Sequence, residues 1–127
     1  MLRTLVLLLL AARAASYSDD LARKASALEK TPEGRSYDPS FDKTLSDQVN
    51  PVMQSCAGLL VTSDLKAVDL VLLLGSSGSV VEGRVKPESA AGKCIRDGVS
   101  RINFPKPPAP PRLMHVRLKV NVSAHGD

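Results

Sequence analysis

The strictest constraint on the fold lies near the end of the chain, where apolar and polar residues alternate without a break. The apolar set is Met114, Val116, Leu118, Val120 and Val122, and the polar set between them is His115, Arg117, Lys119 and Asn121. Alternation with a period of two places one set on each face of a β-strand. The chain is therefore predicted to contain a sheet with one face on a hydrophobic core and one in water.

A β-hairpin is predicted before this strand. Residues 67–74 are a short run rich in Val and Leu, and its length and β-branched content favour a buried strand. Residues 75–78 hold two glycines, which predicts a short hairpin loop with a bulge and a positive φ. The return strand is expected over residues 79–86, with Val81, Gly83 and Val85 on one face.

An amphipathic helix is predicted between the hairpin and the last strand. Ser89 is placed to cap its N-terminus, and apolar residues then recur at spacings of four and three: Ala91, Ile95, Val99 and Ile102. Gly98 is expected to let this helix approach the sheet closely. Five prolines between residues 105 and 111 end the helix and predict an extended connection. A recognition ligand for an aromatic groove is the alternative role of this proline run.

The order strand, strand, helix, strand predicts an α+β fold with a small antiparallel sheet of three strands. The hydrophobic strand, the Gly-Ser-Val turn, the helix ending in Arg-Ile-Asn-Phe-Pro and the alternating strand together resemble the TonB C-terminal domain over roughly residues 48–122. The likeness is greatest to small secreted bacterial TonB-C-like proteins with one cysteine before the hairpin and one in the helix. This resemblance implies the order α-β-β-α-β, with the helices on one face of the sheet.

Further helices are predicted before the hairpin. Residues 18–30 read as a helix capped by Ser18, with a thin apolar stripe of Leu21, Ala25 and Leu28. Residues 31–39 are predicted to be a loop because they contain two prolines and a glycine. A helix capped by Ser40 should follow, either kinked at Pro51 or restarted there.

The first residues resemble a secretory signal peptide. Residues 1–18 contain no acid, and a basic start is followed by a leucine-rich run and a small-x-small site at Ala12–Ala14. The apolar run is much shorter than the roughly 20 residues of a membrane span, so no stable membrane anchor is expected. The predicted division is a signal peptide over residues 1–14, a helical segment over 15–47, the TonB-C-like domain over 48–122 and a tail over 123–127. The expected location is the periplasm or the exterior of a bacterial cell.

The two cysteines, Cys56 and Cys94, are interpreted as one structural disulfide. Closing this loop would contribute on the order of 4 kcal/mol in the chain-entropy model. A redox or metal-binding pair is the alternative. It is disfavoured because the chain has no CxxC motif and because its histidines, His115 and His125, lie far away in the sequence.

Charge is distributed unevenly along the chain. Residues 16–81 hold six basic and nine acidic residues, whereas residues 82–119 hold nine basic and three acidic ones. Four of the basic residues alternate on predicted strands and form a candidate binding face for anions: Arg84, Lys86, Arg117 and Lys119. A solvated sheet face is the simpler interpretation. Nucleic acid is disfavoured as a partner because export removes the chain from it and few aromatic residues can stack on bases.

No catalytic, metal-binding or cofactor-binding motif was found, and His115 is expected to be exposed and inert. The favoured function is a non-enzymatic protein-binding module of the cell envelope that pairs with an extended peptide, since TonB C-terminal domains contact a short strand of outer-membrane transporters. Binding of anionic envelope components and an unrecognised enzyme are the alternatives. The partner is expected to be an envelope protein or peptide, and a sheet edge could also support a homodimer.

Overall fold

The computed structural model describes residues 13–14 and 16–120. The predicted tail and nearly all of the predicted signal peptide lie outside these residues. The elements, in chain order, are β1 (Arg13–Ala14), α2 (Asp19–Glu29), α3 (Pro32–Ser55), α4 (Ala57–Val61), β2 (Ala67–Leu74), β3 (Val80–Lys86), α5 (Ala90–Val99) and β4 (Arg112–Lys119). None of the described helices combines the length and the apolar character that a membrane span requires.

The three main strands form an open antiparallel sheet, as predicted. β2 lies in the centre and pairs with β3 on one side and β4 on the other. The two-residue β1 extends the sheet beyond β3, with Arg13 opposite Glu82 and Ala14 opposite Gly83 in parallel orientation. The outer strands of the sheet are therefore the short β1 beside β3 and the full-length β4.

The β2–β3 hairpin contains the predicted bulge and positive φ. The prediction that Val81 lies on the same face as Gly83 and Val85 was wrong. Gly78 has a φ of 89°, and a Cβ there would lie 1.9 Å from the carbonyl oxygen of Phe104, so only glycine fits. The bulge pairs Leu74 with Val80 and the preceding Leu73 with Glu82. Val80 is consequently the buried residue and Val81 is 45% exposed, because the extra residue shifts the alternation by one position.

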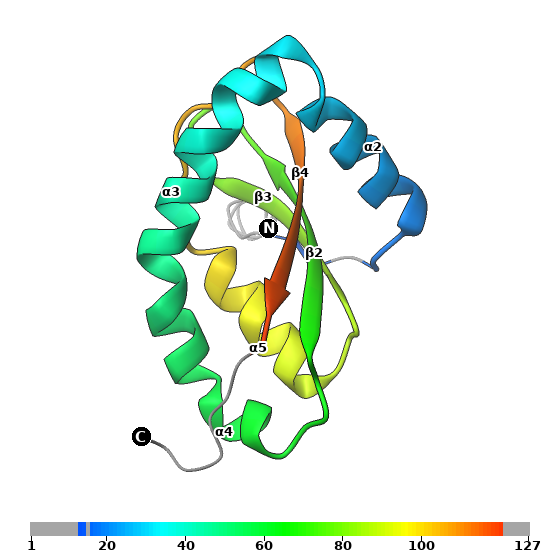
Figure 1. The fold of residues 1–127 in the computed structure, drawn as a ribbon, viewed down its shortest axis with the longest axis vertical. Coiled ribbons are helices and arrows are strands. Elements are labelled where there is room, and N and C mark those ends of the chain that lie inside the picture. The colour runs from blue at the N-terminus through cyan, green and yellow to red at the C-terminus, as the bar shows by residue number, and fades with distance from the viewer. Residues whose placement is uncertain (1–12, 15, 121–127) are drawn as a thin grey trace, which may run out of the picture.

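Helices cover both faces of the sheet, which corrects the expectation that they lie on one face (Figure 1). On the first face, the side chains of Leu70, Leu72 and Met114 pack in the main core with α3 and α5. Val71 points to the second face and is just as fully buried, and beside it His115 contacts Ser26 of α2. The small residues Ala22 and Ala25 let α2 lie close to this second face.

Helix α3 begins earlier than predicted. Its N-cap is Thr31, whose hydroxyl accepts the N–H of Gly34, and Pro32 occupies the first turn, where its missing N–H costs nothing. Residues 31–39 are therefore not a loop, and Ser40 is not a cap. Pro39 and Pro51 lie inside the helix on its exposed side.

The apolar face of α3 compensates for the backbone bonds that its prolines cannot make. Tyr37, Phe41, Leu45 and Val52 are buried along it. The helix crosses residue 48, so one core draws on residues from both sides of the predicted division.

The predicted disulfide joins Cys56, at the end of α3, to Cys94 of α5, with the Cα atoms 5.9 Å apart. Gly98 of α5 faces α3 rather than the sheet, since a Cβ there would lie 2.6 Å from a methyl carbon of Val52. Close packing of the two helices thus replaces the predicted approach to the sheet.

The proline run connects α5 to β4 and packs on α3. The Phe104 ring stacks on Phe41 at 4.3 Å between centroids, and the Tyr37 hydroxyl donates to the Pro105 carbonyl oxygen at 2.6 Å. The run is not extended throughout, because Ala109 has a φ of 48°.

Candidate functional site

The outer edge of β4 carries unpaired backbone groups. Within the described residues β4 pairs only with β2, and Figure 1 shows it in front of β2, between α3 and α2. The Val120 N–H donates to the Lys66 carbonyl oxygen, which fixes the alternation along the strand. In antiparallel pairing both backbone groups of a residue point the same way. Four residues therefore direct N–H and C=O groups away from the sheet: Leu113, His115, Arg117 and Lys119.

The four predicted basic residues lie on the second sheet face, and three of them form ion pairs with acidic residues. Arg84 pairs with Glu82 at 2.6 Å, Lys86 with Asp19 at 3.6 Å, and Arg117 with both carboxylate oxygens of Asp69 at 3.1 and 3.2 Å. Lys119 is exposed opposite Ala67, with no ion pair among the described residues. The four residues share a face, and three of their charges are balanced by neighbouring carboxylates.

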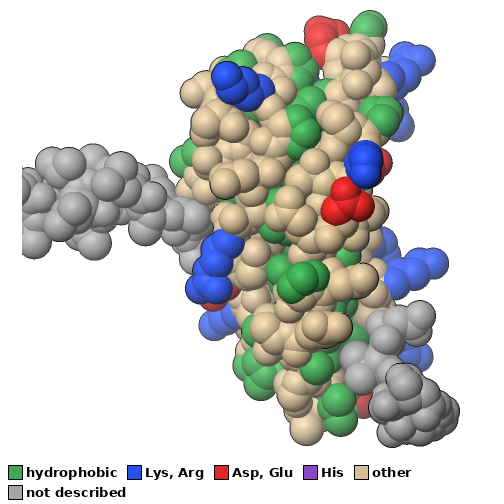
Figure 2. Space-filling model, turned by 90° about the vertical axis from the view of Figure 1, so that its left-hand side faces the viewer, with side chains coloured by type: hydrophobic (Ala, Val, Ile, Leu, Met, Phe, Trp, Pro, Cys, Tyr) green, Lys and Arg blue, Asp and Glu red, His purple; other side chains and the backbone are tan. Residues whose placement is uncertain are grey.

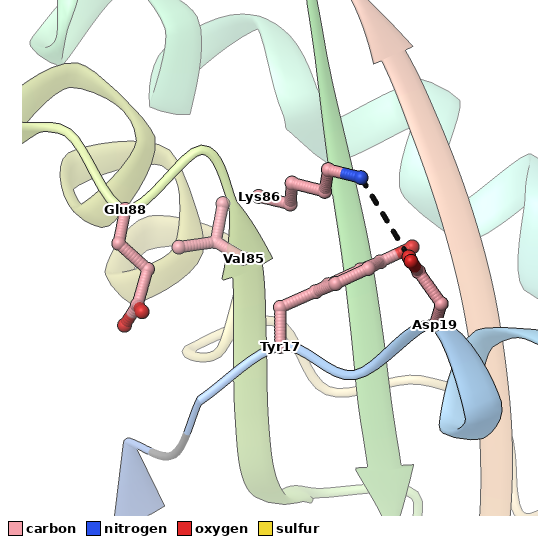
Figure 3. Close-up of a pocket in the computed structure, with 5 residues that line it drawn as sticks. All are labelled: Tyr17, Asp19, Val85, Lys86 and Glu88. Carbon is pink, nitrogen blue, oxygen red and sulfur yellow. Dashed lines mark ion pairs between the residues drawn. The ribbon is translucent and has the colours of Figure 1, made fainter.

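A small pocket lies beside the end of β3 (Figure 3). Its volume is about 270 Å³, below the usual range for ligand sites, and it is lined by Tyr17, Asp19, Val85, Lys86 and Glu88. The Lys86 ammonium lies 5.8 Å from the centre of the Tyr17 ring. Burial, with the nearby carboxylates of Asp69 and Asp19, raises the pKa of the Tyr17 phenol. No sequence pattern pointed to this pocket, because Tyr17 stands alone just after the predicted signal peptide.

Ser26, His115 and Asp69 lie next to one another between α2 and the sheet, but His115 Nε2 makes no hydrogen bond among the described residues. The Ser26 hydroxyl lies 3.2 Å from His115 Nδ1, and His115 Nε2 lies 3.5 Å from an Asp69 oxygen. Hydrolases use the same three residue types, but catalysis also needs a space for substrate beside the nucleophile. Ser26 is half-buried against the sheet, and the pocket beside β3 is lined by other residues. The prediction that His115 is exposed was wrong, because α2 covers it, and its contact with Ser26 serves to attach α2.

Arg112 is a buried charged residue that sequence reasoning missed. Its guanidinium donates to the Leu28 carbonyl oxygen at the end of α2, lies 5.8 Å from the centre of the Tyr37 ring and is 5% exposed. A Cβ on Gly34 would lie 2.7 Å from this guanidinium, so glycine provides its space. The signal was present in the sequence, since Arg112 occupies an apolar position of the β4 alternation.

Two carboxyl groups lie near Arg112, those of Glu29 and Asp38, and both are partly withdrawn from water. Burial, reinforced by Asp38, raises the pKa of Glu29, and burial also raises the pKa of Asp38. Burial raises the pKa of the Tyr37 phenol to about 12. This group joins the end of α2, the start of α3 and the start of β4, so its arrangement is structural.

The surface offers neither a metal site nor a broad apolar patch in the part of the chain that the structure describes. No group of three or more His, Cys, Asp or Glu side chains is placed to hold a metal ion. On the face shown in Figure 2, hydrophobic side chains stand in small separate groups. The large hydrophobic residues exposed among those described are Leu59, Val61 and Val81. The β4 edge therefore remains the strongest candidate for a binding site.

Comparison of the chain with protein-family models, curated protein sequences and solved structures finds no match.

Proposed function

We propose that this chain is an exported, non-enzymatic protein-binding module of the cell envelope that binds an extended peptide as an added strand along β4. The observation that carries the proposal is the outer edge of β4, which pairs with no other strand in residues 13–14 and 16–120 and where Leu113, His115, Arg117 and Lys119 present backbone donors and acceptors. Main-chain pairing supplies affinity in this mode of recognition, and the neighbouring side chains supply specificity.

The properties of β4 support this use of its edge. Exposed edges are commonly shortened, bulged, covered, interrupted by proline or lined with charged side chains, since an open edge invites pairing with other chains. Of these devices, β4 carries the charged side chains Arg117 and Lys119. β4 has eight residues in a regular register with β2. It contains no proline, because the proline run before it ends at Pro111. An incoming strand can thus pair along most of its length.

A TonB C-terminal-like fold is the finer part of the proposal. It is supported by the element order α3, α4, β2, β3, α5, β4 and by the cysteine positions at Cys56 and Cys94. The placement of α2 on the second sheet face departs from the arrangement that the resemblance implied. We therefore propose a related domain that serves another protein contact, rather than a transducer of energy.

The disulfide supports a location in the periplasm or outside the cell. Disulfides persist in oxidising compartments and are rare in the reducing cytosol. Cys56 is 1% exposed and bonded to Cys94 across the core, so this bond is part of the packed fold rather than a surface redox pair.

Charge favours a different protein or peptide over a second copy of this chain as the occupant. In an antiparallel pair of two β4 strands, His115, Arg117 and Lys119 would approach their counterparts, and like charges opposite one another are destabilising. A neutral or acidic peptide has no such cost.

The test uses Arg117→Pro and its control Arg117→Ala. Proline at this position removes one outward N–H and none of the bonds to β2, whereas alanine keeps the N–H and removes only the charge. Residues 15–127, tagged at the N-terminus, are used to capture partners from envelope extract at low and high salt. We expect one protein to be retained at high salt by the parent and by Arg117→Ala, and lost with Arg117→Pro. Equal capture by both variants would contradict binding at this edge.

Binding of anions by the basic residues is the weaker candidate, since Glu82, Asp19 and Asp69 balance three of them. Lipid or polymer retained only at low salt, and reduced in Arg117→Ala, would favour it over strand addition.

A further inference from the structure

The β3 edge is already occupied by this chain's own N-terminal segment, defined as β1 together with Ser16 and Tyr17. β1 pairs with Glu82 and Gly83 in parallel orientation. Beyond it, the Ser16 carbonyl oxygen accepts a hydrogen bond from the Arg84 guanidinium at 2.5 Å. Tyr17 then lies beside Lys86, as Figure 3 shows. The segment follows the strand from Glu82 to Lys86.

We propose that the β3 edge is a second strand-addition site and that the N-terminal segment is a peptide bound there in cis. The inference rests on the strand-addition function proposed above and extends it to the opposite edge of the sheet. It also assigns an orientation, since the bound strand runs parallel to β3. Arg84 is the side chain that recognises the backbone of the occupant, through the carbonyl oxygen of Ser16.

The N-terminal segment is an added ligand rather than part of the core. The main hydrophobic cluster begins at Tyr37 in chain order, and of the segment's side chains that the structure describes, neither Ser16 nor Tyr17 belongs to it. The attachments of the segment are strand pairing, one charge-assisted hydrogen bond and the contact of Tyr17 with Lys86. Tyr17 also lines the 270 Å³ pocket with Val85 and Lys86 of β3, so space is left between this residue and the strand. A chain that starts at Ser18 keeps the cap of α2 and every core residue, and is expected to fold.

Export would change the occupancy of this edge. The predicted cleavage after Ala14 would cut the segment between β1 and Ser16. Glu82 and Gly83 would then lose their partner strand, while the contacts of Ser16 and Tyr17 would remain. Among the described strands, the β3 edge would then be open as well as the β4 edge.

The test is binding in trans of a labelled peptide with the sequence of residues 11–17, amidated at its C-terminus. Fluorescence anisotropy compares the chain starting at Ser18 with the full chain, after circular dichroism and urea unfolding confirm that both are folded. We expect binding to the shortened chain with a dissociation constant of about 0.1 mM or tighter. The full chain should bind at least about tenfold more weakly, because its tethered segment competes at a roughly millimolar effective concentration.

Matched variants identify the site. Arg84→Ala in the shortened chain should weaken binding about tenfold or more, because a charge-assisted hydrogen bond is lost. Arg101→Ala is the control, since this exposed side chain makes no hydrogen bond or ion pair among the described residues. A peptide carrying Arg13→Pro should also bind poorly, because Arg13, opposite Glu82, directs its backbone N–H at β3.

Three results would overturn the inference: no binding to the shortened chain, equal binding to the full chain, or equal binding of the Arg13→Pro peptide. The variant Arg117→Pro in the shortened chain separates the two edges. It should bind the peptide as the parent does, because the peptide pairs with β3 and the substitution alters β4. Loss of peptide binding in Arg117→Pro would place the peptide on β4 and contradict the β3 site, without touching the function proposed for β4.

Discussion

The two faces of the sheet are held by different means. On the first face, α3 and α5 pack an aliphatic and aromatic core and are joined by the Cys56–Cys94 disulfide. On the second face, α2 buries only Ala22 and Ala25 and is attached by the contact of Ser26 with His115. Arg112, on the core side of β4, holds the end of α2 through the Leu28 carbonyl oxygen. From this difference we infer that the first face contributes more to the stability of the fold than the second. We expect α2 to detach locally from the second face while the sheet, α3 and α5 stay folded.

Of the changes predicted here, removing the disulfide on the first face should lower the free energy of unfolding the most. The double variant Cys56→Ala, Cys94→Ala is expected to lose about 4 kcal/mol of unfolding free energy, because the unfolded chain regains loop entropy. Urea unfolding followed by circular dichroism measures the loss. A change below about 1 kcal/mol would show that packing alone holds α3 against α5.

A matched pair of substitutions in β2 compares the faces directly. Leu72 and Val71 are adjacent and equally buried, but Leu72 faces the main core and Val71 faces α2. Leu72→Ala should cost about 3 kcal/mol, since the disulfide-linked helices cannot close the cavity. Val71→Ala should cost about 1–2 kcal/mol, because fewer carbons are removed and α2 can settle into the space. Equal losses in urea unfolding would contradict the asymmetry.

Ser26→Ala should detach α2 without weakening the core. Loss of the contact with His115 is expected to cost about 1 kcal/mol, seen as roughly fivefold faster amide hydrogen exchange within α2. Amides of β2 should exchange at the parent rate. Faster exchange in both elements would mean that α2 and the core unfold as one unit.

The smallest expected effect is a pH dependence that arises near α2. The folded protein raises the pKa of Glu29, so the folded state holds this proton more tightly than the unfolded chain. The contribution to stability is therefore greatest below the ordinary glutamate pKa of about 4.3 and is lost as pH rises through the higher folded value. Urea midpoints between about pH 4 and pH 6 should decline less steeply in Glu29→Gln than in the parent. An unchanged slope would show that Asp38, shifted in the same direction, accounts for the dependence.

Elements with a clear side-chain period could be predicted from the sequence. Local structure follows directly from the alternation in β4, the Gly-rich hairpin loop and the apolar stripe of α5. The disulfide could be predicted because two cysteines allow one intramolecular pairing. The start of α3 was missed because the two prolines and the glycine in residues 31–39 indicated a loop. Thr31 followed by Pro32 in fact forms a strong N-terminal signal.

Features that depend on register or on which face an element covers could not be predicted. A thin stripe on α2 does not say which side of the sheet it covers, and one bulge residue exchanged the roles of Val80 and Val81. For the candidate site, the sequence indicated open sheet edges and the four basic residues. The pairing of Arg117 with Asp69 needed the cross-strand register, and the attachment of Lys86 to Asp19 needed the position of α2.

The most direct test of strand addition is residue-resolved amide hydrogen exchange in β4, measured by NMR with and without the partner captured from envelope extract. The account predicts that exchange slows at Leu113, His115, Arg117 and Lys119, whose N–H groups point outward. Met114, Val116 and Leu118, already bonded to β2, should change little. Unchanged exchange at the four outward amides in the presence of bound partner would contradict the proposal.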